Sequence, residues 1–166
     1  MLKVTTSVIV ALLITGCGAS NRVISNHKLF QSVDEKDVLL VQEGKEKEYC
    51  VRCGMKLSRY YKTSHKAEVE DKKFQYCSFH CLEEHLGEGI RVKNPQVIDV
   101  AHLKYISVMD AFYVVGSKKK GTMSRVSKYA FSSLEEAKKF QRLYGGEIMD
   151  FNKTREIVVK DFKHYR

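Results

Sequence analysis

The sequence predicts an α+β fold made of two small, related β-β-α-β-like units that follow an N-terminal tether. The order strand, strand, helix and strand is indicated at residues 95–157, and a fainter version of it at residues 45–90. The chain has 166 residues, of which 43% are hydrophobic and 30% charged. That length and balance suit one globular domain or two very small ones.

The second unit opens with strands. Residues 111–115 are apolar and rich in β-branched and aromatic side chains, and they end at Gly116, which predicts a buried strand. Residues 129–131 predict a shorter strand, and residues 147–151 predict a final one.

A helix is expected between the last two of these strands. Ser132 or Ser133 can cap its N-terminus, and Gly145 with Gly146 can end it. Apolar side chains recur at helical spacing between these limits, at Leu134, Ala137, Phe140 and Leu143.

The first unit repeats this order weakly. Residues 75–78 parallel residues 129–132, because each segment places an aromatic residue near a strand end and then a Ser that could cap a helix. Gly54 and Met55 have a counterpart in residues 121–123. We therefore infer a short internal repeat, preceded by one short element near residues 38–41.

The net charge of +9 raises the possibility of nucleic-acid binding. The distribution of charge argues against it, because the densest basic run is only residues 118–120 and Lys elsewhere alternates with acidic residues. We expect no nucleic-acid partner. An anionic membrane surface is a more natural neighbour for the surplus charge.

The N-terminus has the order of a signal peptide. Lys3 precedes an apolar run at residues 8–14, which is too short to span a bilayer. Residues 14–17, Ile-Thr-Gly-Cys, resemble the lipobox of bacterial lipoproteins. The resemblance implies a signal peptide at residues 1–16, lipid modification of Cys17, and a lipid-anchored tether at residues 17–44. A buried strand and a plain secretory signal are the alternatives.

This resemblance also implies a location. The protein is expected at the periplasmic face of the cell envelope, with the membrane as a partner through the lipid anchor. Gly18 follows the modified cysteine, where an Asp commonly signals retention in the inner membrane of Gram-negative bacteria. Its absence weakly favours the outer membrane.

Four further cysteines lie in the first unit, as Cys50-x2-Cys53 and Cys77-x3-Cys81. Two close pairs separated by a spacer are typical of a tetrahedral metal site. Two disulfides are the alternative, because the periplasm is oxidising. A metal site in which one pair can oxidise lies between these two interpretations.

Two metals suit these ligands. Zn²⁺ accepts four thiolates, whereas Cu(I) prefers thiolate and thioether sulfur. Met55 follows Cys53 by two residues, and Gly54 between them lets the backbone bend so that both sulfurs can face one point. Met55 could equally be core packing. Auxiliary or weaker candidate ligands are His80, His85, His102, Met109 and Met123.

At these residues the chain resembles the NosL family, the lipoprotein accessory factors of nitrous oxide reductase. The matching segments are scattered over most of the chain after Cys17. They are residues 50–55, 66–69, 97–99, 109–117, 121–123, 129–132 and 145–146.

The resemblance implies a copper(I) chaperone that delivers Cu(I) to a copper-accepting enzyme, nitrous oxide reductase being the suspected client. It also implies a fold of two related α+β units, and it makes Cys53 and Met55 copper ligands, with Met123 a conditional third.

The chain departs from the family in two places. Many relatives have Gly-Pro-Met-Gly at residues 121–124, and many have acidic residues at Cys77 and Ser78. The Cys77-x3-Cys81 pair instead resembles the cysteine motifs of heavy-metal sensing and trafficking domains. That departure supports metal binding and leaves another copper or zinc pathway open.

No convincing catalytic set is present, so the chain is predicted to be a metal carrier and not an enzyme. A structural zinc or disulfide module of an envelope interaction protein is the second hypothesis. A thiol–disulfide oxidoreductase acting through Cys50 and Cys53 is the third. Residues 54–56 give little sign of the helix that such a motif normally opens.

Overall fold

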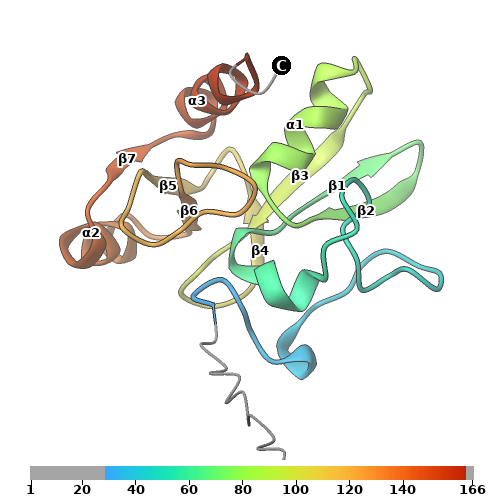
Figure 1. The fold of residues 1–166 in the computed structure, drawn as a ribbon, viewed down its shortest axis with the longest axis horizontal. Helices are drawn as coiled ribbons and strands as arrows, with labels where there is room; N and C mark the ends of the chain where they lie inside the picture. Colours follow the sequence, from blue (N-terminus) through green and yellow to red (C-terminus); the bar gives the residue numbers. More distant parts are fainter. Residues whose placement is uncertain (1–28, 164–166) are drawn as a thin grey trace, which may run out of the picture.

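The computed structural model describes residues 29–163, which fold into two antiparallel sheets with helices packed beside them (Figure 1). The first sheet has the strand order β2-β1-β3-β4, and the second has the order β6-β5-β7. The first sheet and its helix are formed by η2 (Leu57–Thr63), β1 (His65–Val69), β2 (Lys72–Tyr76), α1 (Phe79–Gly87), β3 (Lys93–Ile98) and β4 (Tyr105–Ser107). The second sheet and its helices are formed by β5 (Phe112–Val115), β6 (Lys128–Phe131), α2 (Leu134–Tyr144), β7 (Glu147–Met149) and α3 (Phe151–Lys163).

Both sheets are built on the same β-β-α-β order. In each, the first strand lies in the centre and pairs with the second strand on one side and with the strand after the helix on the other. The registers place Ala67 opposite Phe74 in the first sheet and Tyr113 opposite Ala130 in the second. The predicted α+β fold of two related units is therefore confirmed.

Strand β3 contains Asn94 and Pro95, a pair of residue types that favours turns. A Pro is tolerated here because the pairing of β1 with β3 shifts register between Lys66 and Glu68, opposite this point. Asn94 takes a positive φ of 46° at the same irregularity. The strand thus continues through a bulge.

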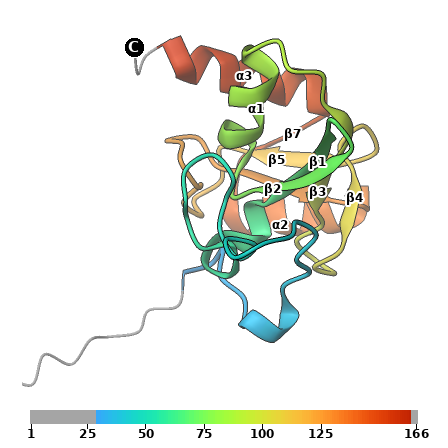
Figure 2. The same ribbon diagram turned by 90° about the vertical axis from the view of Figure 1, so that its right-hand side faces the viewer.

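The two sheets share a hydrophobic core. Phe79 at the start of α1 stacks on Phe151 at the start of α3, with ring centroids 5.0 Å apart. Val97 of β3 and Tyr113 of β5 belong to the same buried cluster. Figure 2 shows α1 and α3 lying alongside each other at the top of the molecule. The core joins the units into one body.

Helix α3 corrects the sequence analysis. Residues 147–151 were expected to form one strand, but β7 ends at Met149 and a helix begins at Phe151. The side chain of Asp150 accepts a hydrogen bond of 2.8 Å from the backbone N–H of Lys153, so Asp150 caps the new helix. Asp150 therefore separates Met149, the last residue of β7, from Phe151, the first residue of α3.

The segment before the first unit also differs from expectation. The one short element found there is η1, a 3-10 turn at Glu35–Asp37, and residues 38–41 pair with no strand. Side chains hold this extended stretch instead. The amide of Gln75 donates to the carbonyl oxygen of Leu39, and its side-chain oxygen accepts from the N–H of Val41.

The described chain starts with a segment anchored to the second unit. The ring of Phe30 packs edge-on against Tyr129, with centroids 5.3 Å apart. The side chain of Gln31 donates hydrogen bonds to the carbonyl oxygens of Lys120 and Gly121. These contacts fix where the N-terminal segment meets the folded part of the chain.

The predicted signal peptide at residues 1–16 and the predicted lipidation site Cys17 lie outside the described residues. Within residues 29–163, the helices are too short or too polar to cross a membrane.

Candidate metal centre

The first cysteine pair sits on a tight turn between β-bridged residues, Tyr49 and Lys56. The N–H of Cys50 donates to the carbonyl oxygen of Met55 at 2.8 Å, and the N–H of Gly54 donates to that of Cys50 at 3.0 Å. Gly54 has a φ of +69°, which a side chain would strain. This backbone turns Cys50 and Cys53 toward the same side.

The second pair spans a strand–helix junction. Cys77 directly follows β2, and Cys81 lies in the first turn of α1. Between them, Ser78 caps the helix, because its hydroxyl accepts a hydrogen bond from the N–H of Cys81. The sequence analysis expected Ser78 to cap a helix, and the structure confirms that cap and places Cys77 just before it.

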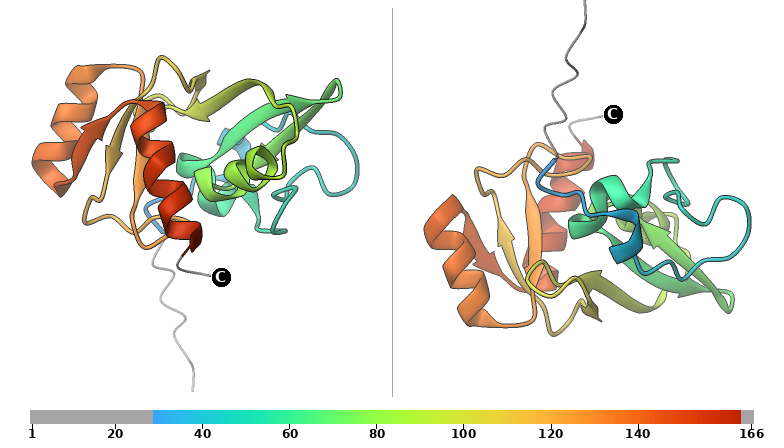
Figure 3. Two further views of the ribbon diagram at one scale, coloured as in Figure 1. Left: turned by 90° about the horizontal axis from the view of Figure 1, so that it is seen from above. Right: turned by 90° about the horizontal axis from the view of Figure 1, so that it is seen from below.

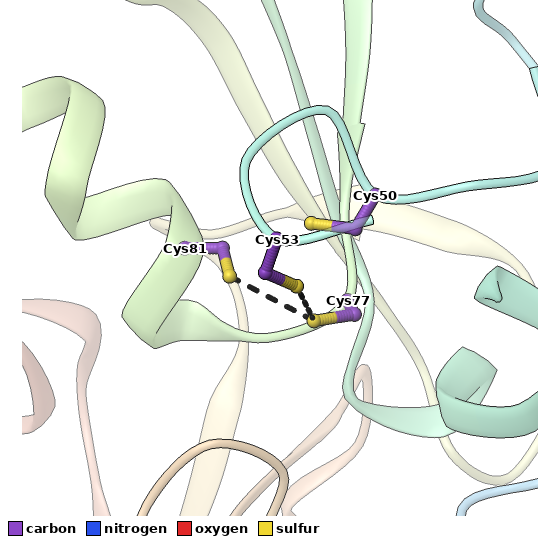
Figure 4. A group of neighbouring side chains, drawn as sticks. All are labelled: Cys50, Cys53, Cys77 and Cys81. Atoms are coloured by element: carbon purple, nitrogen blue, oxygen red, sulfur yellow. Dashed lines mark hydrogen bonds between the residues drawn. The ribbon is translucent and has the colours of Figure 1, made fainter. Parts of the chain in front are cut away.

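The four thiols converge on one point, as Figure 4 shows. Their sulfur atoms all lie within 4.8 Å of one another. The Sγ of Cys77 is 3.4 Å from that of Cys53 and 3.7 Å from that of Cys81. A tetrahedral ion with metal–sulfur bonds near 2.3 Å separates its sulfurs by about 3.8 Å. The cluster therefore has the spacing of a thiolate metal site, and its thiols are not joined by disulfides.

Burial differs within the cluster. Cys50, Cys77 and Cys81 are buried, whereas Cys53 is exposed. The three buried cysteines belong to a hydrophobic core with Leu57 and Leu82. An ion held here would be shielded by the fold on one side and reachable through Cys53 on the other.

The three buried thiols affect one another's ionisation. Hydrogen bonds from the Cys77 and Cys81 thiols lower the pKa of Cys50. The same interactions with Cys50, together with burial, raise the pKa of Cys77 and of Cys81. These interactions favour the thiolate of Cys50 and disfavour ionisation of Cys77 and Cys81. A bound cation would displace thiol protons, which makes metal affinity rise with pH.

Arg52 holds the first pair near the second. Arg52 lies between Cys50 and Cys53 in the sequence. Its guanidinium forms ion pairs with Glu84 of α1, at 3.1 Å, and with Glu88 at the end of that helix. These side chains are partly exposed, so the pairs contribute modestly to stability. Their role is to position the turn against the helix.

Met55 packs against the core cluster that contains the buried cysteines. His85 is engaged elsewhere, because its Nδ1 lies 2.9 Å from the hydroxyl of Tyr76. His102 pairs with Asp99 at 2.6 Å, and Met109 is 62% exposed. His102 is not part of the described thiol group.

Met123 lies on the long turn between β5 and β6 and lines a groove with His80. No cysteine lines that groove. The structure therefore brings the four predicted cysteines together and places Met123 on a neighbouring surface. Sequence analysis missed Arg52, whose position inside the Cys50-x2-Cys53 motif was the available signal.

The comparisons with known proteins concern the family and the fold. The NosL family model matches residues 41–159. A crystal structure of the copper chaperone NosL from Shewanella denitrificans superposes with a TM-score of 0.53 and 23% sequence identity. The similarity covers 69% of this chain and 96% of that chain, and at this identity it concerns the fold. A comparison with curated proteins finds no match.

Proposed function

The chain belongs to the NosL family, and on that premise we propose that it carries Cu(I) and delivers it to a copper-accepting enzyme. It is a carrier and not an enzyme. The suspected client is nitrous oxide reductase, the client that the family resemblance implies. The ion would be held as cargo, because a carrier must release what it binds.

One observation carries the proposal, namely the convergence of four thiol sulfurs within 4.8 Å. Thiolates bind Cu(I) as well as Zn²⁺, and an added thioether ligand favours Cu(I). Exposed Cys53 gives a partner's ligand a point of attack, so the ion can pass by stepwise exchange of sulfur ligands. The thioether of Met55, two residues further on, is the proposed additional ligand.

The location is part of the proposal. We place the protein at the periplasmic face of the envelope, held by lipid on Cys17, and weakly favour the outer membrane. The support is the order of Lys3, an apolar run and a cysteine in the first residues. Labelling with a radioactive fatty acid should mark the wild type and leave Cys17→Ala unmarked.

The main test is an anaerobic titration of the reduced chain starting at Gly18, which keeps every described residue. Cu(I) would be added in competition with a chromogenic chelator and, separately, with Zn²⁺. We expect Cu(I) to bind in preference to Zn²⁺. Cys53→Ser should weaken Cu(I) binding by at least about 100-fold and Met55→Leu by about 10-fold, since loss of even an outer-shell partner costs about 10–100-fold.

Met109→Leu is the matched control, because Met109 is exposed and is not among the side chains that pack against the core of the buried cysteines. It should bind Cu(I) like the wild type. Unchanged Cu(I) affinity in both Cys53→Ser and Met55→Leu would refute the assignment of these ligands.

A structural zinc module is the second candidate, favoured by the sulfur spacing of 3.4–3.7 Å, which suits tetrahedral Zn²⁺. It predicts that Zn²⁺ stays bound against Cu(I) and that Met55 is dispensable. The oxidoreductase hypothesis has less support, because Cys50 and Cys53 lie on a β-bridged turn and open no helix.

A further inference from the structure

The lysine run at residues 118–120 lies where the N-terminal segment meets the folded part of the chain. It belongs to the turn between β5 and β6, and the backbone carbonyl oxygen of Lys120 accepts a hydrogen bond from the side chain of Gln31. The N–H of Lys118 donates to the carbonyl oxygen of Tyr144 at 2.7 Å, which ties the same run to the end of α2. Figure 3 (right) shows the start of the described chain beside this turn. The run is therefore fixed in place next to the first described residues.

Aromatic rings hold a fourth lysine at the same place. The ammonium of Lys62 lies 4.6 Å from the ring centroid of Phe30, and that of Lys119 lies 5.0 Å from the same centroid. The ammonium of Lys119 is also 4.4 Å from the ring centroid of Tyr144. A lysine on an aromatic ring packs its stem and keeps its charge. Four lysines thus lie around the start of the described chain, and we call them the basic face: Lys62, Lys118, Lys119 and Lys120.

The basic face lies within two stretches that contain no acidic residue. Residues 49–67 hold five basic side chains and residues 111–134 hold five, with no Asp or Glu in either stretch. Lys118 and Lys120 are exposed, and no ion pair within residues 29–163 uses a lysine of the 118–120 run. A run of lysines without acidic partners attracts an anionic surface over about one Debye length, which is about 10 Å at 0.1 M ionic strength.

The basic face is also where the proposed tether ends. With Cys17 acylated, residues 18–28 connect the lipid to Leu29, whose apolar side chain is exposed. Membrane attachment commonly combines lipid chains with a basic patch. The tether therefore brings this face, and not another part of the folded chain, closest to the lipid headgroups.

We propose that the basic face binds the phosphate groups of anionic phospholipids and holds the folded part of the chain against the bilayer in one orientation. The inference rests on the proposed location at the envelope and goes beyond the carrier function. Lipid on Cys17 supplies attachment, whereas the lysines supply orientation. Clusters of about four to eight Lys or Arg beside a membrane-embedded segment are typical of anionic-lipid binding. With the face on the bilayer, α1 and α3 lie on the side away from it, as Figure 1 indicates.

The test is sedimentation of the chain starting at Gly18 with lipid vesicles, because this chain lacks Cys17 and can bind only through its own side chains. Vesicles of phosphatidylglycerol should carry the protein into the pellet at about 0.1 M salt, and vesicles of phosphatidylcholine should not. Raising the ionic strength to about 1 M shortens the screening length to about 3 Å and should release the protein. Equal binding to the two lipids, or no binding to phosphatidylglycerol, would overturn the proposal.

Paired variants locate the surface that binds. Lys118→Gln with Lys120→Gln should weaken binding to phosphatidylglycerol vesicles by about 25-fold, since each lysine near an anionic membrane contributes about fivefold. Lys153→Gln with Lys160→Gln is the matched control, because both lysines are exposed on α3 and their loss lowers the net charge equally. The control should bind like the wild type. Equal weakening in the two pairs would mean that only the net charge matters, which contradicts the proposal.

The basic face and the lipid anchor fail separately. No vesicle binding, with fatty-acid labelling of Cys17 intact, would refute the basic face and leave the anchor standing. Salt-sensitive vesicle binding that requires Lys118 and Lys120, without fatty-acid labelling, would support the basic face and refute the anchor alone.

Discussion

The two β-β-α-β units use the same strand–helix junction for different purposes. In the first unit, Cys77 precedes the capping residue Ser78, and in the second, Ser132 precedes the capping residue Ser133. Ser132 donates a hydrogen bond of 2.7 Å to Asp99, which is a structural role. The junction itself is therefore generic, and the thiols added to it in the first unit create the metal centre.

The hydrophobic cores of the two units also differ, because one contains aromatic rings and the other contains thiols. The second unit is filled by aromatic rings, which pack around Phe140 at centroid distances of 4.8–5.8 Å. The first unit buries three thiols where comparable apolar groups would pack. The second unit is thus complete without a ligand, whereas the first acquires further cross-links when a cation joins its thiols.

The largest expected effect tests the independence of the second core. Phe140→Ala should lower the free energy of unfolding by about 3–5 kcal/mol, because it leaves a cavity among aromatic rings. Its Cu(I) affinity should remain that of the wild type. Urea unfolding of the metal-free protein and chelator competition measure the two quantities. A folded Phe140→Ala protein that had lost Cu(I) affinity would show that the two cores are not separable.

The next largest expected effect is a pH dependence of stability caused by His65, which lies where the two units meet. His65 of β1 lies between Phe79 and Tyr113 and is 1% exposed. Burial lowers the pKa of His65 to about 3, against about 6.5 in an unfolded chain. Its contribution to stability is therefore complete above about pH 6.5 and is lost as pH falls toward 3. The slope approaches about 1.4 kcal/mol per pH unit.

Urea unfolding of the metal-free protein between pH 7 and pH 5 measures this slope. Replacing the ring by an apolar one in His65→Phe should flatten the profile. A residual slope is expected, because burial also lowers the pKa of His80 and of His85. A profile equally steep in His65→Phe would exclude His65 as its main source.

The smallest effect compares the two helix caps directly. Ser78→Ala and Ser133→Ala should each cost about 1 kcal/mol, because each hydroxyl accepts a backbone hydrogen bond at a helix N-terminus. Only Ser78→Ala should also change the release rate of Cu(I), since its partner is the N–H of Cys81. Equal release rates in the two variants would mean that the cap does not position the ligand.

Much of the fold was predictable because its signals are local. The spacing of Leu134, Ala137 and Phe140 and the pair Gly145–Gly146 predicted α2, which the structure confirms at Leu134–Tyr144. Helix α3 was missed because Ile148, Met149 and Phe151 were interpreted as parts of one strand. Asp150 was the overlooked signal, together with Phe151, Thr154 and Val158 at helical spacing beyond it.

The candidate site was predictable only in part. The paired spacing of the cysteines indicated that they would converge, since one pair lies on a tight turn and the other at a strand–helix junction. The place of Met123 could not be inferred, because it depends on contacts between residues far apart in sequence. Thr63 and Thr122 are an example, joined across the two units by one hydroxyl contact.

The attachment of Phe30 and Gln31 to the second unit sets the length of the tether between the proposed lipid anchor and the folded part of the chain. With Cys17 acylated, as proposed, eleven residues at 18–28 separate the lipid from the anchored segment. Fully extended, they reach about 40 Å. The tether would therefore keep the folded part of the chain within about 40 Å of the bilayer surface. Figure 1 draws the anchored segment at the bottom of the molecule and α1 with α3 at the top, so these two helices would lie on the side away from the bilayer when the tether is extended.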